Sequence, residues 1–129
     1  MTTFTEVKDY LTDLGYAIKH EEAHEELVII DDEANGIRDL VIDCEYPLLI
    51  FEQLILEFKT DRPEAYKRLL QLNRELLHGA FVLDDSGQKL LFRDTLALEN
   101  LDQNEVESTL NALRIAMAEH ARELIEFSK

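Results

Sequence analysis

At 129 residues the chain has the length of one ordinary domain, and its hydrophobic content of 46% is enough for a real core. We therefore expect a single domain over residues 1–129. Thirteen Lys and Arg residues stand against 28 Asp and Glu residues, which gives a formal net charge of -15. Such a charge repels phosphate backbones and anionic lipid headgroups, so nucleic acid and membranes are not expected partners.

The first residues, "MTTFTEVKDYL", lack the basic and apolar regions of a secretory signal. The single Cys44 cannot form an intramolecular disulfide. No stretch approaches the roughly 18 consecutive apolar residues of a membrane-spanning helix. We therefore expect a cytoplasmic protein.

Capping signals predict a first helix over residues 4–14. Thr3 and Glu6 have the spacing of a capping box, and Gly15 suits the left-handed position after a helix end. Apolar residues recur between them at helical intervals, at Phe4, Val7, Leu11 and Leu14.

Short apolar runs between residues 16 and 58 predict a mainly antiparallel meander of strands. The runs are "YAIK", "ELVII", "LVIDCEY" and "LLIFEQLILEF", separated by "HEEAH", "DDEANG" and Pro47. The run "PLLIF" is apolar on both faces. One face of this strand should pack on the core, and the other should meet a helix or a second subunit.

The second half of the chain predicts a helix from Pro63 to Gly79, a hairpin over residues 80–98 and a final helix over residues 102–126. The apolar stripe of the first of these helices comprises Tyr66, Leu69, Leu70, Asn73, Leu76 and Leu77. In the hairpin, the alternation of the strand places Asp94 on the same face as the apolar side chains. Either a bulge shifts the register there or the carboxylate has a local partner.

The segment "HEEAH", residues 20–24, matches the H-E-x-x-H pattern of zinc proteases. That chemistry needs a helix, on which two histidines one turn apart bind zinc and the glutamate activates a water molecule. Here the segment is rich in Glu and lies between two strand-like runs, which favours a charged hairpin loop. We therefore expect no catalytic residue and no metal ligand. The alternative is a small zinc-dependent hydrolase that uses His20 and His24 as ligands and Glu21 as base.

Three further polar features favour structural roles. "DDEANG", residues 31–36, resembles the start of a calcium loop, but Ile42 stands at the position where a bidentate Glu is needed, so a turn is expected. Asn73 interrupts the apolar stripe of its helix and should be a polar core residue bonded to neighbouring backbone. Cys44 lies among acidic residues, which raise its pKa and leave it unreactive. No cofactor is indicated.

Residues 69–102, "LLQLNRELLHGAFVLDDSGQKLLFRDTLALENLD", resemble bacterial proteins of the YbjN-like and Tir-chaperone-like (CesT-like) group. The likeness rests on "LNRELLHGAF", on "LFRDTLALENL" and on the long final helix, and "YPLLIFEQLIL" also looks like the family. The resemblance implies the fold of class I type III secretion chaperones, an α+β domain in the order α-β-β-β-α-β-β-α. It also implies a homodimer that binds partner polypeptides without ATP or metal.

The resemblance and the absence of a catalytic pattern together predict a non-enzymatic protein-binding module. It would act as a chaperone or a regulatory adaptor and hold partner segments on apolar surface patches as a homodimer. The expected partners are a second copy of the chain and a protein client. Leu72, off the main helical stripe, and Leu91, outward on the last strand, are the expected dimer or partner contacts.

Overall fold

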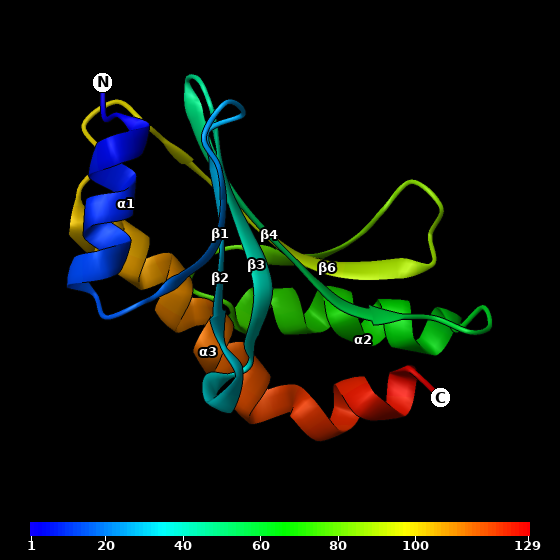
Figure 1. Ribbon diagram of the computed structural model, residues 1–129. Coiled ribbons are helices and arrows are strands. Elements are labelled where there is room, and N and C mark those ends of the chain that lie inside the picture. The colour runs from blue at the N-terminus through cyan, green and yellow to red at the C-terminus, as the bar shows by residue number, and fades with distance from the viewer.

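The chain begins with helix α1 (Phe4–Asp13) in the computed structural model, which covers residues 1–129 (Figure 1). The predicted capping box is present, because the Thr3 hydroxyl accepts a hydrogen bond from the Glu6 backbone and the Glu6 carboxylate accepts one from the Thr3 backbone. The predicted helix is thereby confirmed, with Leu14 as its C-cap.

Six antiparallel strands form one sheet with the order β1-β2-β3-β4-β6-β5. Their bounds are β1 (Ile18–Glu22), β2 (Leu27–Asp32), β3 (Ile37–Glu45), β4 (Leu48–Glu57), β5 (Ala80–Leu83) and β6 (Lys89–Ala97). The stretch "DDEANG" is a turn, with a short 3-10 helix η1 (Glu33–Asn35) between β2 and β3. Four strands precede the second helix, one more than the resemblance implied.

Helix α2 (Pro63–Leu72) starts at the predicted proline but is shorter than predicted. A 3-10 turn, η2 (Asn73–Glu75), follows it, and the chain is extended at Leu76, so the predicted continuation to Gly79 is wrong. Helix α3 (Gln103–Phe127) begins after Asp102, whose carboxylate accepts a hydrogen bond from the Glu105 backbone. None of the helices combines the length and the apolar character that crossing a membrane requires.

All three helices cover one face of the sheet, and two groups of buried side chains lie between them and the strands (Figure 1). The first core cluster joins α1 and the first half of α3 to β2, β3 and β4, and it includes Phe51 and Phe92. The second core cluster joins α2 and the end of α3 to the far parts of β4 and β6, and it includes Phe58 and Leu90. The side chains that contact both clusters are Ile55, Leu76 and Met117.

Asp94 has a local partner rather than a bulge beside it. The ladder between β4 and β6 is regular there, with Phe51 opposite Asp94. One carboxylate oxygen of Asp94 accepts a hydrogen bond of 2.7 Å from the hydroxyl of Thr109, a fully buried residue of α3. The other accepts one of 2.9 Å from the Thr95 backbone. A polar pair therefore connects β6 to α3 inside an otherwise apolar interface.

Candidate partner-binding groove

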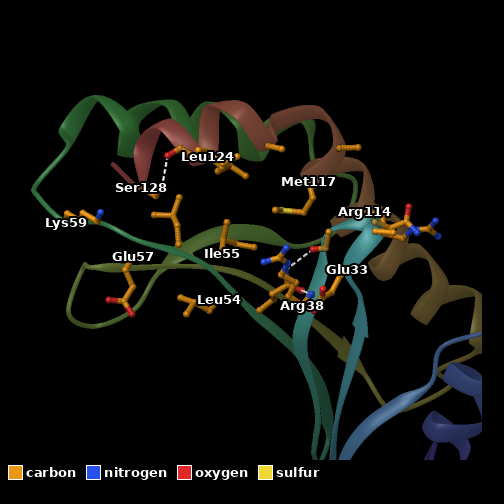
Figure 2. A pocket seen from close by; sticks show the side chains of 18 residues that line it. Glu33, Arg38, Leu54, Ile55, Glu57, Lys59, Arg114, Met117, Leu124 and Ser128 are labelled. Carbon is orange, nitrogen blue, oxygen red and sulfur yellow. Dashed lines mark hydrogen bonds between the residues drawn. The ribbon is translucent and has the colours of Figure 1, made fainter.

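A groove of about 750 Å³ lies between the second half of β4 and the C-terminal half of α3 (Figure 2). Its apolar lining comes from both elements: Leu54, Ile55 and Leu56 of β4, and Met117, Leu124 and Ile125 of α3. Leu54 is 49% exposed and Ile125 is 59% exposed. Exposed side chains of this size, gathered in a concave surface, indicate a binding site.

The groove exists because β3 and β4 separate. Their last paired residues are Val41 and Glu52, and from Gln53 to Glu57 strand β4 pairs with β6 alone. The edge of β4 that would otherwise face β3 has no strand partner over this stretch. An unpaired edge presents backbone N–H and C=O groups, which an added extended chain can satisfy.

Gln53 holds the two strands together where the ladder ends. Its side chain is 2% exposed, and its Nε2 donates a hydrogen bond of 3.0 Å to the Gly36 carbonyl. Its Oε1 accepts one of 3.0 Å from the Arg38 backbone. The sequence prediction missed this residue, although Gln53 shares the inward phase of Leu49 and Phe51, where a polar side chain needs a partner.

A β-bulge sets the direction of the side chains along the groove floor. Leu54 pairs with Leu91 and Leu56 pairs with Leu90, so Ile55 is the extra residue on β4. Leu54 is consequently exposed, Ile55 is half-buried and Leu56 is buried. The bulge thus places two consecutive apolar side chains, Ile55 and Leu56, on the helix side of β4, whereas Leu54 points to the other face of the sheet with Leu91.

Helix α3 forms the wall of the groove opposite β4, and its position is fixed by a close approach to η1. Gly36 follows η1 with a φ of 83°, and a Cβ added there would lie 2.5 Å from the Cβ of Met117. No other residue type fits this position without displacing α3. The turn and the helix therefore meet directly at one end of the groove.

Three cationic residues line the groove, and none of them forms an ion pair within the chain. Arg38 and Arg114 lie toward one end and Lys59 toward the other (Figure 2). The acidic lining residues are Glu33 and Glu57. The groove thus has a cationic excess in a chain whose net charge is -15.

The face of the sheet opposite the helices is a second exposed surface, which we call the open face. Its side chains include Asp39, Asp43 and Glu45 from β3, Ile50, Glu52 and Leu54 from β4, and Lys89, Leu91 and Arg93 from β6. Arg93 forms an ion pair with Glu52. The acidic residues of β3 and the basic residues of β6 therefore lie on either side of β4, on which Ile50 and Leu54 are apolar and Glu52 is paired.

Asp43 is the one residue of the open face with an unsatisfied buried atom. Its Oδ1 is buried and has no hydrogen-bond partner. Burial, followed by the negative charge of Glu45, raises the pKa of Asp43 to about 6. The ionised carboxylate is therefore unfavourably placed in the isolated chain.

The "HEEAH" segment is a strand and a turn, which contradicts the zinc-hydrolase alternative. His20 and Glu21 lie in β1, whereas His24 lies in the turn to β2. The pattern places two zinc ligands together only on a helix. Both histidines are exposed, and His20 Nε2 instead contacts Glu22 Oε1 at 2.7 Å.

Two other titratable side chains, Cys44 and His120, have the surroundings of structural residues. Burial, followed by the charges of Glu26 and Asp43, raises the pKa of Cys44 to about 12, so the thiol is not activated. His120 of α3 lies 3.6 Å from Glu75 and 3.8 Å from Glu119, measured from the ring Nε2 to a carboxylate oxygen. Both carboxylates are exposed, as in an ordinary surface cluster of charges.

The three site residues predicted from the sequence, Leu72, Asn73 and Leu91, have different surroundings in the structure. Leu72 is 0% exposed in the second core cluster, so its proposed place on a contact surface is wrong. Asn73 is half-buried, and its amide forms two hydrogen bonds with the backbone of Phe81 on β5. Leu91 is half-buried on the open face, so a contact role for it stays a prediction.

The CesT_Tir_1 family model matches residues 1–129. The chain belongs to this family. A comparison with curated proteins finds no match. The family and the observed element order confirm the predicted α+β fold and the resemblance to Tir-chaperone-like proteins.

Solved structures with the same fold include YbjN from E. coli and type III secretion chaperones. YbjN is 19% identical, with a TM-score of 0.68, over 94% of this chain and 92% of that chain. The HopA1–SchA chaperone–effector complex gives 18% identity and a TM-score of 0.61, over 96% and 91% of the two chains. The Yersinia pestis chaperone SycH, solved with a fragment of YscM2, gives 15% identity and a TM-score of 0.61, over 98% and 100%.

Proposed function

We propose that this protein is a non-enzymatic, chaperone-like binding module that holds a segment of a partner polypeptide in the groove between β4 and α3. The observation that carries the proposal is the unpaired edge of β4 from Gln53 to Glu57, which lies within an apolar groove. The shared fold with solved chaperone–effector complexes supports it.

An extended partner segment suits both parts of the groove. Its backbone would pair with the β4 edge, and its apolar side chains would cover exposed residues such as Leu54 and Ile125. Each ~100 Å² of apolar surface covered would contribute about 2.5 kcal/mol. Ordering the segment offsets a large part of this gain, so the complex is expected to be reversible.

Paired substitutions on α3 test this site. Ile125 lines the groove and is 59% exposed, whereas Ile115 is 50% exposed on the same helix and lies outside the groove. The probe is a cysteine-free reporter protein of near-zero net charge, kept unfolded by a core substitution and labelled with a fluorophore. Fluorescence anisotropy should show binding to the wild type and to Ile115→Glu, and at least tenfold weaker binding to Ile125→Glu.

The outcome depends on the contrast between the two variants. Each introduces the same charge at an exposed position of α3, so a loss of affinity confined to Ile125→Glu places the segment in the groove. Equal losses in both variants, or no binding by the wild type, would contradict the proposal. Circular dichroism melts of both variants check that the fold is unchanged.

We also propose that the protein forms a homodimer through the open face, with Leu91 in the contact. The acidic strip on β3 and the basic strip on β6 lie on either side of β4, which presents Ile50 and Leu54. A two-fold axis along β4 would place the acidic strip of each copy over the basic strip of the other. The unpartnered carboxylate of Asp43 would then meet a cation, which relieves its unfavourable burial.

Light scattering coupled to size-exclusion chromatography tests the dimer. The wild type should have twice the mass of one chain, and Leu91→Glu should be monomeric. Leu70→Glu is the matched control, because Leu70 is 69% exposed on α2, away from the open face. A monomeric wild type, or a Leu91→Glu variant that remains dimeric, would refute this interface.

A further inference from the structure

The groove is lined by charged as well as apolar side chains. Its lining combines three unpaired cations with two carboxylates, although acidic residues outnumber basic ones by 28 to 13 in the whole chain. The remaining acidic residues of the chain lie outside this lining. The residues that line the groove therefore carry a small positive formal charge, in contrast to the negative net charge of the whole chain.

Screening by salt determines whether a bound segment experiences the local charge of the groove or the net charge of the whole chain. The Debye length is about 8 Å at physiological ionic strength, so charges farther away than this contribute little. A chain lying on the β4 edge is adjacent to Arg38 and Lys59 and to the two lining carboxylates, Glu33 and Glu57, while acidic residues farther away than this length are screened. The cations at the groove therefore dominate the selection of the bound segment.

The positions of the cations define a pattern for the ligand. Arg38 and Arg114 lie toward one end, Lys59 lies toward the other, and Leu54 and Ile55 lie between them (Figure 2). The unpaired edge of β4 from Gln53 to Glu57 is about 16 Å long at ~3.3 Å per residue. The complementary ligand is an extended aliphatic stretch of about this length with a carboxylate at each end.

We propose that the groove recognises an extended, aliphatic segment of a partner polypeptide that is flanked on both sides by acidic residues. This inference rests on the proposed function, and it adds the chemistry of the partner. It commits to an acidic segment even though the protein itself is strongly acidic. A basic client, which the net charge alone would favour, is disfavoured at this site.

Three labelled peptides test the selectivity. One has five aliphatic residues flanked on each side by two aspartates, and the other two carry serines or lysines in place of the aspartates. Fluorescence anisotropy with the wild-type protein should show the aspartate peptide binding about tenfold tighter than the serine peptide, and the lysine peptide binding most weakly. Raising the salt concentration should reduce the difference.

Two double variants assign the selectivity to the groove. Arg38→Gln with Arg114→Gln should lose most of the preference for the aspartate peptide over the serine peptide, because only Lys59 remains at the other end. Lys67→Gln with Arg122→Gln removes two unpaired cations outside the groove and should retain the wild-type preference. Thermal melts by circular dichroism verify that both double variants are folded.

The outcomes separate this inference from the proposed function. Equal binding of the three peptides would overturn the acidic preference and leave a groove that binds polypeptides. Binding of none of them would overturn both. A dimer that Ile125→Glu dissociates would also overturn both, because a second copy would then occupy the groove.

Discussion

Asn73 forms two hydrogen bonds with the backbone of one residue, Phe81, at the outer edge of the sheet. The amide Nδ2 of Asn73 donates to the Phe81 carbonyl at 3.1 Å, and the Phe81 N–H donates to Asn73 Oδ1 at 2.7 Å. Strand β5 is the last strand of the sheet and pairs only with β6. The Asn73 side chain therefore takes the place of a neighbouring strand at Phe81, where the edge is closed to other chains.

Replacing Asn73 with alanine should lower the free energy of unfolding by about 1–3 kcal/mol, because both backbone groups of Phe81 lose their partner. Urea unfolding followed by circular dichroism measures the change. Asn111→Ala is the control, since Asn111 is exposed on α3. Similar stabilities for the two variants would show that the contact with Phe81 contributes little.

Asp43→Asn should stabilise the single chain at pH 8 and have no effect at pH 4. The folded pKa of Asp43, about 6, lies above the value of about 4 for an unfolded chain. The folded state therefore loses stability as the pH rises from 4 to 6, and the full penalty is present above 6. Solvent screens this partly exposed carboxylate, so we expect a gain of about 1 kcal/mol at most.

Urea unfolding at both pH values checks this, at a protein concentration where light scattering shows single chains. Asp85→Asn, in the exposed turn after β5, is the control. The proposed dimer predicts the opposite sign for association, because the same substitution removes a partner for the cations of the second copy. A less stable single chain at pH 8 would refute the unfavourable burial of Asp43.

Gly36→Ala should destabilise the protein more than Gly87→Ala. Both glycines have a positive φ, where an L residue costs about 1–2 kcal/mol. A Cβ at Gly87 meets nothing within 4 Å, whereas a Cβ at Gly36 would collide with Met117. The extra loss, about 1–3 kcal/mol, should appear in thermal melts. Equal losses would mean that α3 moves freely away from η1.

Thr109→Val should cost about 1–3 kcal/mol, because it leaves the carboxylate of Asp94 without its buried hydroxyl donor. A double-mutant cycle with Asp94→Asn isolates the pair, and the two substitutions should be non-additive. Urea unfolding of the four proteins gives the coupling energy. Additive losses would show that Thr109 and Asp94 act independently.

Helix α2 shows where periodicity predicts an element correctly and its buried face wrongly. Leucines stand on both candidate faces, at Leu70 and Leu72, so composition does not decide between them. In the structure the buried positions are Ala65, Leu69 and Leu72, while Leu70 is 69% exposed. The small Ala65 lets the helix approach the sheet, and a hydrophobicity pattern gives such a residue little weight.

The groove could not be predicted from the sequence, for a different reason. The period of two assigns side chains to the faces of β3 and β4 but does not say where the two strands stop pairing. That point depends on the bulge at Ile55 and on the side chain of Gln53, which are tertiary features. Arg38 and Arg114 carry no pattern of their own, because only the fold brings them to one groove.

The contacts of Ile55 and Met117 with both core clusters have a consequence for mechanical coupling across the domain. Both side chains also line the groove, so a bound segment would contact two of the three residues that pack against both core clusters. Occupancy should then slow amide hydrogen exchange in β2 and in α2 alike, although neither element borders the groove. A segment bound in the groove would therefore make the whole domain more rigid.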